Sequence, residues 1–319
     1  MRSVLSSIFA ALFMAVGAPA LAQDYHLIPG SVPEDKGPDG NTIIFDAPQG
    51  LIVVDTGRHS EHSAAILAYA KQRGRPIAAI VNTHWHLDHT TGNYDIRSVY
   101  PRAEVYATTA IEGALVGYLK GDRTVGDKML ADPKTPPEQK AQMLRGRSVI
   151  DNPDRLRATR PVTRSGKMMI AGRRLDVRVA PFAASEADLW FNDPRSKVAV
   201  VGDLVVGIVP FMDTACPNGW AKALDEIAKV PFTTLIPGHG DPMTRSDFLI
   251  WRTAYNNLLA CGRSAADKKA CVAGWSKDAA KFIPVSQKAY VDEAADYYID
   301  TRLRSSPEKQ QHFCKPLRA

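Results

Sequence analysis

The sequence predicts an α/β fold, because short apolar strands alternate with helices through its first half. These elements are expected, in order, as strands at 42–46 and 51–55, a helix at 61–73, strands at 76–82 and 103–107, and a helix at 108–120. Ser60 is expected to cap the first helix and Gly74 to end it. The 319 residues, 45% hydrophobic and 23% charged, exclude a disordered or fibrous chain and can form one large domain.

The second half of the chain is expected to continue with further strands and helices. Four prolines interrupt residues 120–160, which should therefore form short helices over one face of the molecule. The later elements are expected as strands in 161–180, 188–192 and 197–203, a helix at 218–229, a strand in 233–240, and mainly helices after about Thr244.

The first 22 residues have the pattern of a secretory signal peptide. Arg2 precedes an apolar run at 4–17 that is too short to span a membrane comfortably, and Ala-Leu-Ala at 20–22 supplies small residues for cleavage. An uncleaved anchor helix is the alternative. We expect a mature chain that begins at Gln23, is periplasmic or secreted, and has no transmembrane segment.

Export would place the four cysteines in an oxidising compartment, where disulfide bonds form. Cys261 and Cys271 are close in sequence and make the expected local bridge, which leaves Cys216 to pair with Cys314. Because no CxxC spacing occurs, a cysteine zinc site is not expected.

Four potential metal ligands lie in the segment 84–89, His-Trp-His-Leu-Asp-His, directly after the strand expected at 76–82. In an extended loop, His84 and His86 point to one side and can share an ion, whereas Asp88 and His89 can turn toward a second. Imidazole nitrogen and carboxylate oxygen together suit Zn²⁺. A polar surface loop is the alternative, but so dense a set at the carboxyl end of a strand favours a metal site.

This H-x-H-x-D-H segment resembles the signature of the metallo-β-lactamase superfamily. Three further segments match that family in order and spacing: D-T-G at 55–57, G-D at 202–203 and P-G-H-G at 237–240. The resemblance implies a four-layer αββα sandwich in a single domain at 23–319, with a core at about 41–250 and a helical C-terminal extension at about 251–319. It also implies a set of metal ligands formed by His84, His86, Asp88, His89, Asp203 and His239.

One ligand of the family pattern is missing. The family places a histidine in a pattern such as H-T-x-G-D-L-W, and the matching stretch here is ASEADLW at 184–190, so Ala184 stands at the histidine position. No histidine lies between His89 and His239. The first subsite therefore has two histidines where three are usual, while the second keeps its full set with an aspartate as bridge. The resemblance thus implies one zinc ion, with room for a second.

Several residues could compensate for the missing ligand or support those that remain. Water, Glu186 or His59 could fill the gap, although a solvent-exposed helix start is the favoured interpretation of both His59 and His62. Asp55 either orients a metal-bound histidine through its second ring nitrogen or caps a turn. Trp85 is expected in the core.

The resemblance implies an exported zinc hydrolase, in which metal-bound hydroxide attacks an ester, thioester, lactone, amide or related small substrate. Asp88 would be the catalytic residue that orients the water or serves the second ion. The alternative is a catalytically weakened scaffold of the same fold that binds a ligand or partner. The net charge of +6 is too small to favour nucleic-acid binding. Residues 120–178 hold 15 Lys/Arg and 7 Asp/Glu, which indicates either a solvated surface or attraction for an anionic substrate.

Overall fold

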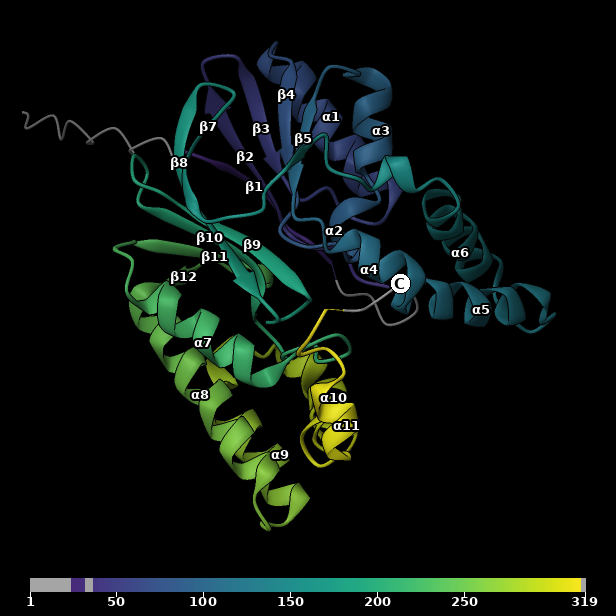
Figure 1. Ribbon diagram of the computed structural model, residues 1–319, viewed down its shortest axis with the longest axis vertical. Coiled ribbons are helices and arrows are strands. Elements are labelled where there is room, and N and C mark those ends of the chain that lie inside the picture. The colour runs from purple at the N-terminus through teal and green to yellow at the C-terminus, as the bar shows by residue number, and fades with distance from the viewer. Residues whose placement is uncertain (1–23, 32–36, 317–319) are drawn as a thin grey trace, which may run out of the picture.

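The computed structural model describes residues 24–31 and 37–316, and its centre is a pair of six-stranded sheets packed face to face (Figure 1). The expected signal peptide lies outside the described residues. The strands of the first sheet follow chain order and are β1 (His26–Ile28), β2 (Thr42–Ala47), β3 (Gly50–Val54), β4 (Ile77–Val81), β5 (Glu104–Ala107) and β6 (Arg160–Pro161). The second sheet has the order β12 (Met243–Thr244), β11 (Thr234–His239), β10 (Val198–Val206), β9 (Ala187–Asp193), β8 (Arg173–Pro181) and β7 (Gly166–Ile170).

The alternation of side chains along the strands explains why the sheets stack. In β9, Leu189 and Phe191 enter the apolar cluster between the two sheets, whereas Trp190 enters the cluster on the outer face of the second sheet. Helices α1 (Ser60–Arg73) and α3 (Asn93–Val99) flank the first sheet, on which a third cluster lies. The described residues therefore form the αββα sandwich implied by the resemblance.

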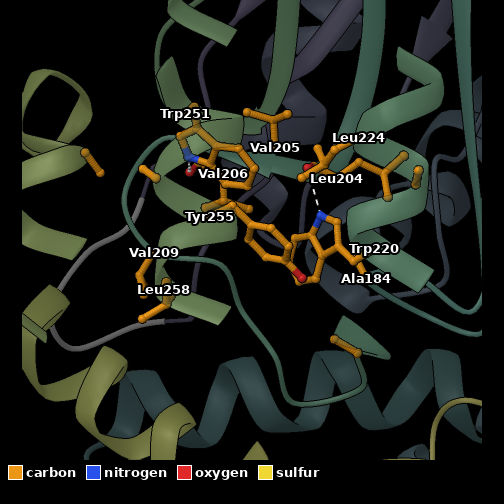
Figure 2. Close-up of a cluster of buried hydrophobic side chains, with 14 of the residues drawn as sticks. Ala184, Leu204, Val205, Val206, Val209, Trp220, Leu224, Trp251, Tyr255 and Leu258 are labelled. Carbon is orange, nitrogen blue, oxygen red and sulfur yellow. Dashed lines mark hydrogen bonds between the residues drawn. The ribbon is translucent and has the colours of Figure 1, made fainter. Parts of the chain in front are cut away.

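Two tryptophans attach the outer helices to β10, the strand that carries Asp203. Trp220 of α7 (Pro217–Ala228) donates its indole N–H to the carbonyl of Leu204 at 2.9 Å. Trp251 of α8 (Arg245–Arg263) donates to the carbonyl of Val206 at 2.7 Å, and Figure 2 shows both bonds within the apolar cluster. Because buried indoles require such partners, these contacts determine how both helices sit on the second sheet.

The C-terminal region is helical, as expected. It contains α9 (Lys268–Asp278), α10 (Lys288–Tyr298), the π-helical segment η4 (Ile299–Leu303) and α11 (Pro307–Gln311). Both expected disulfides are confirmed: Cys261–Cys271 joins α8 to α9, and Cys216–Cys314 joins the start of α7 to the chain after α11. The helix α8 runs unbroken through residue 250, where the core was expected to end, and the division of the chain into core and extension stays a prediction.

The structure differs from the sequence expectation in three local details. The N-cap of α1 is His59 rather than Ser60, although Gly74 ends the helix in the left-handed conformation as expected. The helix expected at 108–120 is divided at Gly117 into α4 (Ile111–Val116) and α5 (Tyr118–Ala131). The segment expected to form short helices instead holds two helices of 14 residues, α5 and α6 (Pro137–Ile150).

These two helices project from the sandwich beside α4 (Figure 1). Short 3-10 turns complete the described structure at Pro153–Arg155, Ala280–Phe282 and Val285–Gln287. Among the described residues, no helix combines the length and apolarity that crossing a bilayer requires.

Candidate metal centre

The six expected ligands meet where β4, β10 and β11 end or bend at one edge of the sandwich. Two sets result. At the first subsite, His84, His86 and Asp203 each offer an atom within 4.8 Å of the others. At the second subsite, the same holds for Asp88, His89, Asp203 and His239. Asp88 and His89 belong to the short helix α2 (Leu87–Thr90), which follows the histidine pair. Asp203 is common to both sets and therefore lies between the two subsites.

Several buried atoms in this cluster have no hydrogen-bond partner among the described residues. They are Nε2 of His84, His89 and His239, and Oδ1 of Asp203. This carboxylate oxygen lies 3.2 Å from Nε2 of His89 and 3.5 Å from Nε2 of His239. Leaving buried polar atoms unpaired costs about 1–3 kcal/mol each, so they require a partner. Nitrogen and carboxylate oxygen atoms that face one another in this way fit a divalent metal ion.

The tautomer of His89 is determined by Asp55. The Oδ2 atom of Asp55 lies 2.8 Å from Nδ1 of His89, and its Oδ1 atom accepts the backbone N–H of Thr83 at 2.8 Å. An ionised carboxylate can only accept, so Nδ1 of His89 carries a proton and Nε2 is the nitrogen left to bind a metal. Asp55 therefore orients a candidate ligand histidine, which decides between the two interpretations of this residue.

Asp55 also orients His84, through Thr83. The hydroxyl of Thr83 donates to Oδ2 of Asp55 at 2.7 Å and lies 3.1 Å from Nδ1 of His84. A hydroxyl has one proton, and here that proton goes to the carboxylate, so the oxygen accepts the Nδ1 proton of His84. The lone pair of His84 is then on Nε2, the atom without a partner.

Thr214 does the same for His86. Its hydroxyl donates to the carbonyl of Ala184 at 3.0 Å and lies 2.8 Å from Nε2 of His86. The threonine oxygen therefore accepts the Nε2 proton of His86, which leaves Nδ1 available for a metal. These contacts also place the backbone of Ala184 beside the first subsite.

Two glycines allow the segments that carry the candidate ligands to pack closely together. A Cβ atom at Gly238 would overlap Oδ1 of Asp203, and one at Gly202 would overlap the side chain of Thr83. Gly202 also has a φ of 52°, which glycine adopts without the cost that a side chain would add. Asn41 completes this region by donating its amide to the carbonyls of Pro237 and Gly240, which holds the loop that carries His239.

The charges favour ligation at Asp88 and His84, whereas at His89 the surrounding carboxylates outweigh burial and raise the pKa well above its usual value, so that a metal would displace a proton there. Burial alone would raise the pKa of Asp88, but His89, His239 and Arg58 outweigh burial and hold it well below the usual range. Burial and the neighbouring rings of His89 and His86 lower the pKa of His84 well below its usual value. An ionised carboxylate and a neutral imidazole are the forms that bind a metal.

This geometry agrees with a known family, because residues 36–239 match the model of the metallo-β-lactamase superfamily. The chain belongs to this superfamily. It is 25% identical over 222 residues to a linear primary-alkylsulfatase of a Pseudomonas species, which covers 63% of this chain and 41% of that protein. It is 40% identical over 52 residues to a hydroxyacylglutathione hydrolase of a Synechococcus species, which covers 16% of this chain and 21% of that protein.

Solved structures of the superfamily share the fold. A metallo-β-lactamase family protein of Thermus thermophilus superposes with a TM-score of 0.58 at 16% identity, covering 88% of this chain and 95% of that one. The curated relatives named above are hydrolases by name, and the chain spans less than half the length of each.

In this metallo-β-lactamase superfamily member, the C-terminal helices help to line a cleft beside the candidate ligands, the metal cleft. The cleft has a volume of about 280 Å³, and Tyr290 and Tyr298 line it together with Asp88 and Asp203. The hydroxyl of Tyr298 donates to Oδ2 of Asp213 at 2.6 Å, which holds the loop before α7 against the extension. Neither tyrosine was predicted from the sequence, because only the fold brings them to the candidate metal centre.

Three further contact residues were not identified from the sequence. Arg58 lies 3.7 Å from Asp88 and borders the cleft. Its position directly after the D-T-G segment is a signal that could have been used, as is the position of Thr83 directly before His84. Thr214 had no such signal, since 128 residues separate it from His86.

The expectation that His59 and His62 form a solvent-exposed helix start is wrong. The side chain of His59 is 15% exposed, and its Nδ1 atom lies 2.8 Å from Oδ2 of Asp39. His62 is 8% exposed and lies 2.7 Å from the hydroxyl of Thr42. Neither histidine belongs to the metal-capable sets found among the described residues, and neither does Glu186.

Trp85 is buried in an apolar cluster with Leu119, as expected for a core residue. It also lines the metal cleft, where its ring lies 4.5 Å from that of His86. One side chain therefore packs in the core and also borders the cleft.

Proposed function

We propose that this protein is an exported zinc-dependent hydrolase of a small ester, thioester, lactone, amide or sulfate ester. The observation that carries the proposal is the group of unpartnered buried atoms on His84, His89, His239 and Asp203. Hydrolase names among the curated relatives support the reaction class. Four histidines and two aspartates suit zinc better than magnesium or calcium, which prefer oxygen ligands throughout.

The second subsite is proposed to hold the ion more tightly. Asp88, His89 and His239 supply three ligands there, the number typical of a catalytic zinc, and Asp203 supplies a bridge. His84 and His86 supply only two side chains to the first subsite, which is consistent with weaker binding. Zinc supplies a Lewis acid that lowers the pKa of water to about 7 and polarises the bond to be cleaved.

The side chains around the cleft provide the remaining functions. Asp88 faces the cleft as an ionised carboxylate and can accept a hydrogen bond from a water molecule, which it thereby orients. Arg58, beside Asp88, offers a cation to an anionic group of the substrate. Tyr118 and Tyr298 form apolar walls that limit the access of bulk water.

Export is supported by the signal-peptide pattern and by the two disulfides. Expression of the full chain in a Gram-negative host, followed by fractionation and mass spectrometry, tests this. We expect a periplasmic product that begins at Gln23. A product that keeps residues 1–22 and stays with the membrane would favour the anchor alternative instead.

Zinc content and turnover test the proposed reaction together. Protein purified without chelator should contain about one zinc per chain and hydrolyse at least one member of a panel of aryl esters, thioesters, lactones, β-lactams and alkyl sulfates. His312→Ala, which changes an exposed histidine near the C-terminus, serves as the control that keeps its zinc. A folded, zinc-free protein that remains inactive after zinc is added would support the scaffold alternative, for which the alanine at position 184 is the main argument.

A further inference from the structure

A second groove lies next to the metal cleft, between α5 and α6. It has a volume of about 350 Å³ and shares Arg58, Leu87 and Asp122 with the metal cleft. Two cavities that share three lining residues lie next to each other, which is the arrangement that one elongated ligand spanning both would require. The groove thus extends the cleft away from the ligand cluster and along the helical pair.

The groove has a predominantly apolar lining. Its apolar side chains are Leu87, Val125, Met129, Leu130, Met143 and Ile150. Gly126 and Gly146 lie between them, one on each helix. A Cβ atom at Gly126 would meet nothing within 4 Å, and one at Gly146 would meet only Cδ1 of Leu87 at 3.6 Å. The two glycines therefore leave open space along the groove, between helices that are otherwise lined by large side chains.

The charged residues around the groove are mostly neutralised by one another. Arg147 forms an ion pair with Asp127, and Arg123 lies 3.2 Å from Asp151. Both partners of each pair lie within residues 120–178, so these pairs leave the basic excess of that segment unchanged but neutralise the charges that border the groove. Arg58 stands at the junction of groove and cleft, 3.7 Å from Asp88, where an anionic end of a ligand would meet its guanidinium.

We propose that the groove between α5 and α6 binds an unbranched alkyl or acyl chain of the substrate, while the polar, anionic end lies beside Arg58 at the metal cleft. The position of the polar end rests on the proposed function, because that end carries the bond to be cleaved. The binding of the chain depends only on α5, α6 and Leu87. The position of the groove next to the cleft favours this occupant over another protein, because a protein bound between α5 and α6 would not need to contact the metal centre.

The affinity of the groove for a ligand should depend on the length of the ligand's chain. Each methylene that leaves water for an apolar groove strengthens binding about three- to fourfold. Affinity should therefore rise with each added carbon until the chain fills the groove, and then become constant. A site that recognises only the head group would show no such dependence.

Calorimetric titration of the full mature protein with straight-chain alkanoates of four to twelve carbons tests this, with and without added zinc. We expect dissociation constants to fall about threefold per carbon over the middle of the series in both conditions. Equal affinity for butanoate and decanoate, or dimerisation through α5 and α6 that alkanoates do not affect, would overturn the proposal.

Two matched pairs of variants locate the binding. Gly146→Leu fills the groove and should weaken decanoate binding at least tenfold. Gly274→Leu makes the same change in α9, where a Cβ meets nothing within 4 Å, and should leave decanoate binding unchanged. Leucine is a better helix former than glycine, so neither variant should unfold. Val125→Asn and Leu144→Asn alter side chains of similar exposure, 55% and 56%, of which only Val125 lines the groove. Equal losses within either pair would contradict the assignment.

Hydrolysis of p-nitrophenyl esters of the same acids separates this proposal from the proposed function. Chain-length-dependent binding without hydrolysis of any ester would leave the groove assignment intact and count against the hydrolase. Hydrolysis with no dependence of KM on chain length would support the hydrolase and overturn the groove assignment.

Discussion

Thr214 accepts the Nε2 proton of His86 while it donates its own proton to the carbonyl of Ala184. Position 184, where the family pattern has a histidine, thus contributes a backbone carbonyl and no imidazole. The carbonyl acts through Thr214 to keep Nδ1 of His86 available. The first subsite is therefore short of a ligand and yet has both of its histidines oriented by hydrogen bonds.

Replacement of Thr214 by valine tests this relationship. Thr214→Val leaves the Nε2 proton of His86 and the carbonyl of Ala184 without a partner. Supporting hydrogen bonds of this kind change metal affinity about 10–100-fold. We expect the binding of a second zinc ion to weaken by that factor, measured by titration against a chromophoric chelator, and the first ion to be unaffected. Thr214→Ser keeps the hydroxyl and should behave as the unaltered protein does.

The two subsites should respond unequally to loss of a histidine. His239→Ala removes a ligand from the set that is complete and should reduce bound zinc steeply, because two protein ligands remain where three are typical. His84→Ala should reduce it less. Zinc per chain, measured by mass spectrometry after gel filtration, checks both. Equal losses would show that the subsites bind zinc with similar strength.

Asp55 orients two candidate ligands at once, so its loss should be more damaging than that of Thr214. Asp55→Asn cannot accept protons from both His89 and Thr83 in the same way, and we expect zinc affinity to fall about 10–100-fold. Asp225→Asn, which alters an exposed aspartate on α7, is the control. An unchanged affinity in Asp55→Asn would mean that the ring of His89 is held by its packing alone.

Introducing a histidine at position 184 tests the alignment with the family pattern. Ala184 is 1% exposed and belongs to the apolar cluster of Figure 2, so Ala184→His alone should overpack this cluster at a cost of about 1–3 kcal/mol. Combining it with Thr214→Ser creates space beside His86 and keeps the hydroxyl that orients His86. We expect the double variant to bind more zinc than the protein does, and thermal unfolding to register the strain of the single one. A folded double variant without additional zinc would show that position 184 does not face the first subsite.

The disulfides should differ in their effect on stability. In the chain-entropy model, the short loop of Cys261–Cys271 corresponds to about 3 kcal/mol and the long loop of Cys216–Cys314 to about 5 kcal/mol. Urea unfolding of the paired serine variants checks this order. Oxidised, denatured protein should show no reactive thiol, because the described structure leaves no cysteine free. Reactive thiols in periplasmic protein would count against both bridges.

Much of the sandwich could be predicted because its signals are local. The strands around Val53, Ile80 and Val200 are apolar segments bounded by turn residues, and each was expected within a few residues of its observed ends. The break at Gly117 and the burial of His59 were not expected. The burial of His59 depends on a residue that is distant in sequence, since its ring contacts Asp39.

The four candidate ligands of residues 84–89 and the cysteine pairing could be inferred from residue type and spacing, which require no knowledge of where the chain runs, whereas Asp203 and His239 were implied by the resemblance to the family. The orientation of the imidazoles of His86 and His89 could not be inferred, because it depends on a hydroxyl or carboxylate from another segment: Thr214 is brought to His86 across 128 residues and Asp55 to His89 across 34. The groove between α5 and α6 and the tyrosines of the C-terminal helices have the same origin. Local sequence determines which atoms can bind a metal, whereas tertiary packing places their hydrogen-bond partners and so decides which lone pairs remain free to do so.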